Sequence, residues 1–371
     1  MPKTEKQPAE PKLWKDYLNR ESVSKIASEI GRIHKPFDQP AFVDAVITDG
    51  FFELELKQRI ESIADALKDY LPSNFSKSTG IFKKAAPKLG GFENWALMTY
   101  IERFGLEHLE QSIAAMKALT QHCTAEFAIR PFIIRYPDRM LNVMNEWTVN
   151  PNEHIRRLAA EGSRPRGVWT LHIEAFKKNP RPVLKILEKL KADPSLYVRK
   201  AVANNLNDIS KEHPDLVIKT ALKWKKQGND LTDWIVKHAC RSLIKKGDPR
   251  VFPIFGFTAS PKLDVKALSL SKKRIKIGGE LVLKAELKSL SKKSQKLAID
   301  YKVIYVKKGG KTSPKVFKLT EKELSPGNKL SLSIKHSFQD RSTRLHHPGK
   351  HRLELVINGK SFGSLEFHLT R

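Results

Sequence analysis

One stretch of this sequence places charged and aromatic side chains where they can act on an anionic partner. It runs from Asn152 to Trp169 and reads NEHIRRLAAEGSRPRGVW. The helical pattern must end near Gly162, so Glu161 is expected in the last helical turn, where the helix dipole disfavours an anion. Arg157, one turn earlier, is the expected partner of that carboxylate. An ordinary ion pair at the end of a surface helix would explain both residues, and so would a carboxylate held there for chemistry.

The residues that follow Glu161 favour the second explanation. Arg164 and Arg166 lie in a Ser-Arg-Pro-Arg loop, and a new helix is expected near Trp169. Phosphate-binding groups, an aromatic platform and a carboxylate therefore come together in one loop. A carboxylate in a groove that binds phosphate groups repels those groups. Binding alone does not require it, whereas stabilising a developing positive charge does.

Two further carboxylates are candidates for the same site. Glu126 lies in the segment TAEFAIRPF, on a helix expected to be mostly apolar. The alternative explanation is a capping residue near the start of that helix. Asp208 lies in NNLNDISKEHP and is expected in the last turn of a helix, against the dipole, as Glu161 is. Here the alternative is a polar helix end.

The net charge narrows the class of partner. Among 371 residues, 68 are lysine or arginine and 40 are aspartate or glutamate, which gives a formal charge of +28. Such self-repulsion is relieved by a polyanion, so nucleic acid is favoured over a protein with a merely basic surface. The chain is 40% hydrophobic, which suffices for a core, and it has no apolar run long enough to span a membrane. Without a secretion signal, and with two cysteines, it is expected to be cytoplasmic.

The N-terminal two thirds of the chain is expected to be helical. Residues 1–15 are rich in Pro, Lys and Glu without periodicity, which predicts a flexible tail. In 16–256, apolar residues recur three and four apart, and prolines separate the runs. Similar segments surround Ile155, Val198 and Ile235, at spacings of 43 and 37 residues. Repeats of ~40–47 residues are typical of HEAT-like solenoids, which stack helix pairs around a continuous core and expose a concave binding face.

In residues 257–371, apolar residues recur at every second position, which is the period of a β-strand. Seven short strands, separated by turns such as Gly-Gly, Pro-Gly-Asn and Asn-Gly, predict an immunoglobulin-like β-sandwich without its disulfide. This segment holds 26 Lys and Arg against 9 Asp and Glu, a net charge of +17, so it is also expected to touch the polyanion. The predicted fold class is multidomain: an all-α HEAT-like-repeat solenoid followed by an all-β immunoglobulin-like sandwich.

The sequence does not predict a cofactor. Gly310-Lys-Thr and Gly359-Lys-Ser resemble the end of a phosphate-binding loop, but both lack the glycine that such a loop has five residues earlier. His346, His347 and His351 have no acidic or cysteine ligand nearby. A basic loop that contacts phosphate is therefore favoured over a metal site at these histidines.

Two segments resemble a known family. The segment HIRRLAAEGSRPR from His154, followed by Trp169, and the segment VRKAVANNLNDISK from Val198 are similar to the bacterial HEAT-like-repeat alkylpurine DNA glycosylases. The closer resemblance is to the AlkC branch, which carries an immunoglobulin-like C-terminal domain. It covers the chain from about residue 18 to the end. That family removes cationic alkylated bases, chiefly 3-methyladenine and in this branch also 3-methylcytosine, by hydrolysing the N-glycosidic bond.

The resemblance implies roles for particular residues. It places Glu161, Glu126, Asp208 and Trp169 at functional positions, with Arg157 beside them. A 3-methylated adenine already carries a positive charge and leaves without protonation. The enzyme need only hold the lesion, oppose the oxocarbenium-like sugar and position water. Carboxylates can do the last two, and a tryptophan can stack on the sugar or on the cationic base.

Basic residues of the repeats are expected to bind DNA: Arg157, Arg164, Arg166, Arg130, Arg199 and Lys200. The expected protein is a monofunctional hydrolase that acts as a monomer on double-stranded DNA containing alkylated bases, without metal, cofactor or membrane. The alternative is a non-enzymatic HEAT-repeat protein that binds nucleic acid or serves as an adaptor. It would share the fold and the charge, but it would have no need of the carboxylates.

Overall fold

The computed structural model describes residues 13–341 and 344–371. Most of the predicted N-terminal tail, 1–15, lies outside these ranges. Trp14–Tyr17 forms a 3-10 helix, η1, so the helical region begins before the predicted start at residue 16. None of the described helices is long and apolar enough to cross a membrane.

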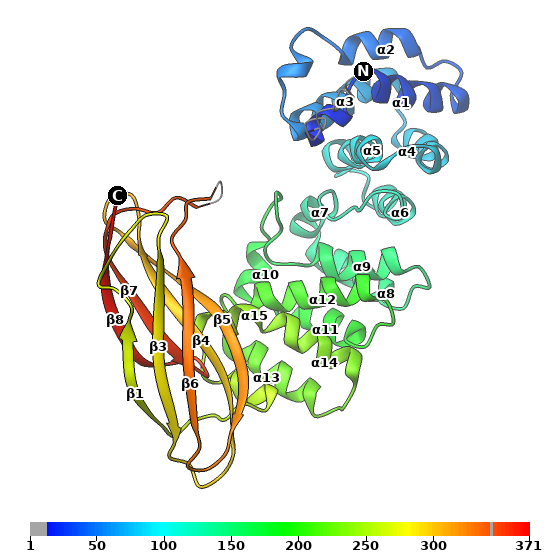
Figure 1. The fold of residues 1–371 in the computed structure, drawn as a ribbon. Helices are drawn as coiled ribbons and strands as arrows, with labels where there is room; N and C mark the ends of the chain where they lie inside the picture. Colours follow the sequence, from blue (N-terminus) through cyan, green and yellow to red (C-terminus); the bar gives the residue numbers. More distant parts are fainter. Residues whose placement is uncertain (1–12, 342–343) are drawn as a thin grey trace, which may run out of the picture. The chain divides into compact units, whose positions relative to one another are not determined.

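Fifteen α-helices follow one another as far as Lys246 in the described part of the chain (Figure 1). Three of them begin at the predicted repeats, and in each a side chain caps the first turn: Asn152 before α9, Ser195 before α12 and Asn229 before α14. The bounds are α1 Arg20–Ile33, α2 Gln39–Val46, α3 Leu56–Tyr70, α4 Phe75–Ala85, α5 Gly91–Phe104, α6 Leu109–Leu119, α7 Ile129–Arg135, α8 Pro137–Trp147, α9 Glu153–Gly162, α10 Glu174–Lys178, α11 Arg181–Leu190, α12 Leu196–Ile209, α13 Pro214–Lys225, α14 Asp230–Ala239 and α15 Arg241–Lys246.

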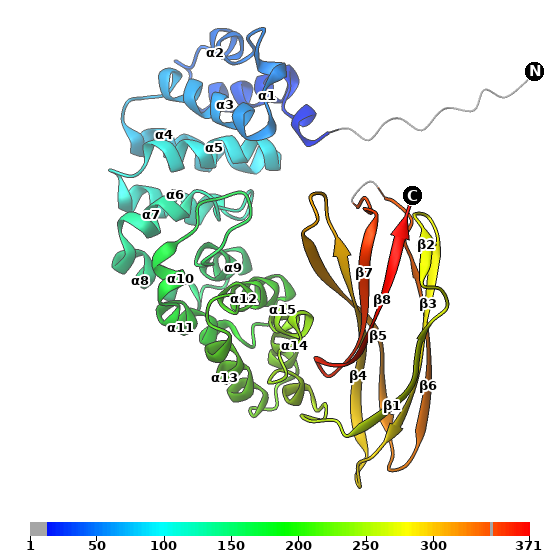
Figure 2. The same cartoon turned by 90° about the vertical axis from the view of Figure 1, so that its left-hand side faces the viewer.

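The chain divides into two compact units, Met1–Glu212 and His213–Arg371. In the first unit the helices pack in a stack, in which α9 contacts α8, α11 and α12 (Figure 2). Buried apolar residues at helical spacing form these contacts, such as Ile155 and Leu158 of α9 and Val198 of α12. This confirms the predicted solenoid of stacked repeat helices.

The second unit contains α13 to α15 and eight β-strands in two sheets. One sheet has the order β1–β3–β6 and the other β2–β8–β7–β4–β5. Side chains from both sheets share one core, including Leu283, Val303 and Phe367, which confirms the predicted sandwich. The strands are β1 Leu263–Leu270, β2 Arg274–Lys276, β3 Glu280–Ser289, β4 Gln295–Val306, β5 Thr312–Leu324, β6 Lys329–Ser337, β7 Gly349–Ile357 and β8 Lys360–Thr370. The strand missing from the prediction is β2, which is too short to show a period and pairs parallel with β8.

The change from helix to strand lies between Phe255 and Leu263, where the period of the sequence changes. The division into compact units lies earlier in the chain, and the segment after α15 contacts the β7–β8 turn. An added Cβ on Gly247, just after α15, would come within 2.9 Å of the Gly359 carbonyl oxygen in the β7–β8 turn. A boundary at 256/257 therefore marks a change of secondary structure, while the compact unit that holds the sheets begins upstream of it.

Candidate active site

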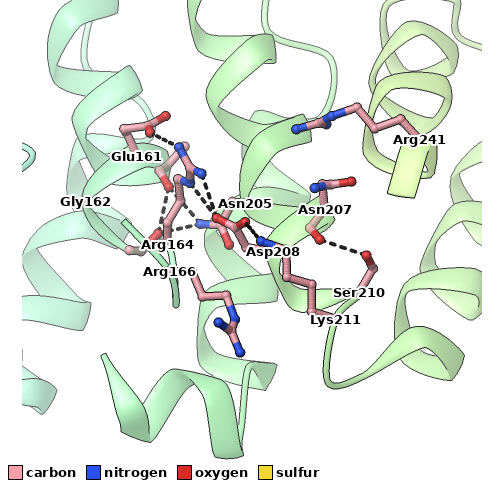
Figure 3. Close-up of polar contacts among 12 residues, drawn as sticks. Glu161, Gly162, Arg164, Arg166, Asn205, Asn207, Asp208, Ser210, Lys211 and Arg241 are labelled. Carbon is pink, nitrogen blue, oxygen red and sulfur yellow. Dashed lines mark hydrogen bonds and ion pairs between the residues drawn. The ribbon is translucent and has the colours of Figure 1, made fainter. Parts of the chain in front are cut away.

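Glu161 and Asp208 lie where the helix patterns predict them, in the last turns of α9 and α12. The two helices pack along each other, which brings these turns together (Figure 3). Glu126 lies in the turn that precedes α7 and not on a helix, so its predicted helical position is wrong. All three carboxylates belong to the first compact unit.

Arg164 joins the carboxylates of Glu161 and Asp208 (Figure 3). Its Nη1 contacts Glu161 Oε1, while its Nε and Nη2 lie 2.8 and 2.7 Å from Asp208 Oδ2. Lys211 contacts the other oxygen of Asp208 at 3.0 Å. The Arg164 side chain is 12% exposed and serves as a counterion of the acids, while its contact with DNA stays a prediction.

Arg157 joins Glu161 to Glu126. Its Nη2 lies 2.5 Å from Glu126 Oε2 and 3.7 Å from Glu161 Oε2, so the predicted partner is the more distant of the two. The Thr124 hydroxyl accepts from Arg157 Nη1 and donates to Glu126 Oε2 at 3.2 Å. Two arginines thus link three acids in one row, the carboxylate–arginine cluster: Glu126, Arg157, Glu161, Arg164 and Asp208.

The cluster is largely withdrawn from water. The side chains of Asp208 and Glu161 are 4% and 8% exposed, and that of Glu126 is 21% exposed. Anions in such surroundings need paired cations, which the two arginines provide. Burial lowers the pKa of Arg164, but the Glu161 and Asp208 carboxylates outweigh it and hold that pKa above its ordinary value. Glu161 therefore does not belong to an ordinary, exposed ion pair at the end of a surface helix.

Local contacts fix the end of α9, next to Glu161. The Ser163 hydroxyl and the Asn205 amide each donate at 2.8 Å to carbonyl oxygens in the last turn of α9. A Cβ on Gly162 would lie 2.9 Å from Ile129 Cγ2, so glycine allows α9 to approach α7 this closely. Because Asn205 belongs to α12, the two repeats fix the position of Glu161 together.

Arg130, one of the predicted DNA-binding residues, is buried and bonded to the backbone of the protein itself. The residue is 1% exposed, and its guanidinium donates to the carbonyl oxygens of Gly162, Arg164 and Leu171 at 3.3, 2.7 and 2.5 Å. Burial and the nearby Arg164 charge lower its pKa to about 10. Arg130 therefore holds both ends of the 162–171 loop, which carries the predicted DNA-binding side chains.

Trp169 lies in the loop and not at a helix start, since the next helix, α10, begins at Glu174. Its φ is 60°, in the left-handed region that residues with a side chain rarely adopt. Trp169 is 60% exposed and meets Trp14 edge-on, with ring centroids 6.2 Å apart. Its carbonyl oxygen accepts from Lys57 at 3.2 Å. These contacts are with the N-terminal part of the chain and not with the carboxylate–arginine cluster.

The other predicted DNA contacts fall into two groups. Arg199 donates to two carbonyl oxygens just before α12, as Arg156 does just before α9, so it has a structural role in the repeat. Arg166 pairs with Glu212, and their side chains are 31% and 28% exposed. Lys200 is exposed on α12. Of the predicted basic residues, Arg166 and Lys200 are thus the ones placed to meet a ligand from solvent.

Comparison with known proteins agrees with this architecture. Residues 106–243 match the family described as DNA alkylation repair enzyme, and residues 264–371 match the C-terminal Ig-like domain of YhaZ. The chain is 39% identical to the uncharacterized protein YhaZ of Bacillus subtilis strain 168, over 96% of this chain and 99% of that protein. It is 37% identical to Pseudomonas fluorescens alkylpurine DNA glycosylase AlkC, solved bound to DNA containing an abasic site analog, with a TM-score of 0.87 over 96% of this chain and 99% of that one.

The chain belongs to the AlkC-like family of DNA alkylation repair enzymes. The resemblance inferred from the two repeat segments is thereby confirmed, as is the Ig-like nature of the C-terminal sheets. In this AlkC-like chain, the whole carboxylate–arginine cluster lies within the stretch that matches DNA alkylation repair enzymes.

One aromatic residue beside the cluster is missing from the prediction. The Tyr197 ring centroid lies 5.0 Å from the Arg157 guanidinium carbon, and His154 packs against the same ring edge-on. Tyr197 is 40% exposed, so it presents a ring to solvent next to the acids. The repeat contains the signal that could have found it, because His154 and Tyr197 occupy equivalent positions 43 residues apart.

Replacing Arg130 by lysine is expected to loosen the 162–171 loop, because an ammonium group cannot span the three carbonyls that the planar guanidinium reaches. Amide exchange in the loop should accelerate by at least about tenfold, the equivalent of about 1.4 kcal/mol. Hydrogen–deuterium exchange of peptides that cover the loop measures this. Arg199→Lys is the control, since Arg199 binds carbonyls outside the loop; equal loop exchange in both variants and the parent chain would contradict the assignment.

Proposed function

We propose that this chain is a monofunctional DNA glycosylase that hydrolyses the N-glycosidic bond of cationic alkylated bases, 3-methyladenine and 3-methylcytosine, in double-stranded DNA. It acts as a monomer and without a cofactor. The observation that carries the proposal is the carboxylate–arginine cluster, in which three acids are withdrawn from water in a chain with a charge of +28. Acids at this place weaken the attraction for phosphate, so a protein that only binds DNA has no use for them. Membership of the AlkC-like family supports the proposed reaction.

A cationic base makes the hydrolysis simple. The bond between C1′ of the sugar and the base nitrogen breaks, and its electron pair leaves with the base, which becomes neutral. The sugar remains as an oxocarbenium-like cation, which a carboxylate stabilises. A water oxygen then bonds to C1′ and the water gives up a proton to a carboxylate, which leaves an abasic site. Because the base departs without protonation, the reaction needs no general acid.

The geometry suggests a division of labour among the acids. We assign the sugar cation to Glu161, which lies in the middle of the cluster, between Arg157 and Arg164. We assign the positioning and deprotonation of the attacking water to Glu126, because its carboxylate is the most exposed of the three. Asp208 holds Arg164 through both Nε and Nη2, and so keeps the guanidinium against Glu161.

Trp169 offers a ring for the lesion. It is 60% exposed, and its left-handed backbone is the kind of strain that gathers at functional sites. Stacking of the indole on a cationic base contributes ~0.5–2 kcal/mol through cation–π attraction, which a neutral base forgoes. Trp169 therefore favours the charged lesion over undamaged bases.

Arg166→Ala and Lys200→Ala are expected to weaken binding to undamaged and to methylated DNA by the same factor, since phosphate contacts carry no information about the base. Removal of one phosphate-binding side chain should make the slope of log affinity against log salt shallower by about 0.9. Fluorescence anisotropy with both duplexes over a salt series measures the two quantities. If either variant lost only its preference for methylated DNA, that side chain would contact the lesion and not the backbone.

The reaction is tested by incubating the protein with two duplexes, one treated with dimethyl sulfate to form 3-methyladenine and one carrying a 3-methylcytosine introduced by synthesis. We expect free 3-methyladenine and 3-methylcytosine in solution, in amounts equal to the abasic sites left in the DNA. Binding without any free base would favour a non-enzymatic HEAT-repeat adaptor. Strand breaks formed by the protein itself would contradict a monofunctional enzyme.

A further inference from the structure

The second compact unit contains a cavity that the proposed reaction does not use. It measures about 220 Å³ and lies where α15 meets the β4–β5 hairpin and the segment after β6. Four cationic side chains line it, Lys245, Lys307, Lys315 and Arg344, together with His346. At about 30 Å³ per water molecule, the volume accommodates a tetrahedral oxyanion and a few waters.

The positive charge of this cavity is not balanced by its own lining. No acidic side chain lines it in the described part of the chain. Burial and the neighbouring charges of Arg344, Lys245 and Lys307 lower the pKa of Lys315. Cations gathered in this way repel one another, and an anion placed among them removes the repulsion.

His346, one of the residues that line the cavity, has a buried polar atom. Its side chain is 2% exposed, and its Nδ1 lies 3.0 Å from an oxygen of Asp340. Its Nε2 is buried and has no hydrogen-bond partner among the described residues. With Nδ1 against the Asp340 carboxylate, Nε2 is the ring nitrogen left to hydrogen-bond to a ligand.

Arg344 is held in place before any ligand binds. It hydrogen-bonds to the Tyr305 hydroxyl, and its guanidinium carbon lies 5.5 Å from the centroid of the Tyr305 ring. The same hydroxyl lies 2.8 Å from His336 Nε2, and His336 Nδ1 lies 3.0 Å from the Tyr301 hydroxyl. Burial lowers the pKa of His336 to about 4, so this ring is neutral and links the two tyrosines. A guanidinium fixed by such contacts loses little freedom when it binds an anion.

We propose that this cavity binds a phosphate group. The three lysines supply charge, Arg344 supplies a planar fork of donors, and His346 supplies a buried ring nitrogen, which together suit a tetrahedral oxyanion. Two sources present this chemistry: the backbone of DNA and a free phosphate ester. The cavity shares no residue with the carboxylate–arginine cluster, so phosphate binding does not rest on the proposed reaction.

Calorimetric titration of the full chain with inorganic phosphate tests the proposal. Lys307→Gln combined with Lys315→Gln should weaken binding at least about tenfold, because the double substitution removes two charge-assisted hydrogen bonds to the anion. The matched control is Lys308→Gln combined with Lys322→Gln, which removes two exposed charges from the same hairpin and spares the cavity lining. The control should bind phosphate as the parent chain does. His346→Phe keeps a ring in the cavity wall but removes Nε2, so it should weaken binding without a change in lysine charge.

Binding to duplex DNA, measured over a salt series, distinguishes backbone phosphate from a free phosphate ester. If the pocket variant shows a salt slope shallower than that of the control by about 0.9 for each lysine removed, the site takes backbone phosphate. An unchanged slope, together with weaker binding of inorganic phosphate, assigns the site to a free phosphate ester. The proposal is overturned if phosphate does not bind the parent chain, or binds all variants equally. Base release from methylated DNA is recorded in parallel, and its failure would concern the proposed reaction alone.

Discussion

Single-turnover release of a cationic base should fall by about 100- to 1,000-fold when Glu161 is replaced by glutamine, a loss of about 3–4 kcal/mol. Glutamine keeps the size and hydrogen-bonding reach of the side chain and removes its charge. Because the positive sugar develops only in the transition state, the loss belongs to the chemical step. Equilibrium affinity for methylated DNA should hold steady or rise slightly, since an anion that faces phosphates has gone.

The structure also sets the stability expected of this variant. The Glu161 side chain is 8% exposed and bonded to charged groups. The free energy of unfolding of the Glu161→Gln variant should therefore fall by about 1.5–3 kcal/mol, more than the loss of an exposed ion pair would cost. Glu153→Gln, an exposed position in the first turn of the same helix, is the control and should release base at the parent rate. Parent-like release by Glu161→Gln would end its assigned role, and variants of Glu126 and Asp208 would then be compared.

The second large effect concerns Arg164. Its replacement by methionine leaves Glu161 and Asp208 buried without the cation that they share. Breaking a buried ion pair in this way should lower the free energy of unfolding by about 3–5 kcal/mol. Arg166→Met breaks an exposed pair with Glu212 and should lower the free energy of unfolding by at most about 1 kcal/mol. Urea denaturation, followed by helical circular dichroism, compares the two variants.

A combined variant shows whether the loss arises from unpaired charge. Arg164→Met together with Glu161→Gln and Asp208→Asn removes the acids as well as the arginine, so most of the stability should return. Equal losses for Arg164→Met and Arg166→Met, or no recovery in the combined variant, would mean that the cluster is not held together by its charges.

Local rules sufficed to place two of the three acids. Gly162 and the Ser-Arg-Pro-Arg loop end one helix, and the residues before Pro214 end the other, so Glu161 and Asp208 fall in last turns. The spacing of 43 residues between Ile155 and Val198 identified the repeat helices. Helix ends and repeat spacing depend on residues that are close to one another in the sequence, so both can be predicted from the sequence alone.

The partners of those acids could not be predicted in the same way. Arg164 bonds to Asp208 across 44 residues, and such a contact depends on how α9 and α12 pack. Arg130 looks like any other basic residue of a helix until the chain folds around its guanidinium. The left-handed backbone of Trp169 has no sequence signal of the kind that a glycine or asparagine would give. Burial and long-range packing pair two of the predicted DNA-binding residues, Arg130 and Arg164, with groups of the protein itself.

We propose that the lesion's own charge makes it a leaving group and that the enzyme supplies no general acid. The most direct test of this proposal is single-turnover base release from two duplexes, one with 3-methyladenine and one with its neutral isostere, 3-deaza-3-methyladenine, at the same position. We expect rapid release of 3-methyladenine, with one abasic site for each free base, and no measurable release of the neutral isostere. Equal release of both bases, or tight binding of the methylated duplex without any free base, would contradict it.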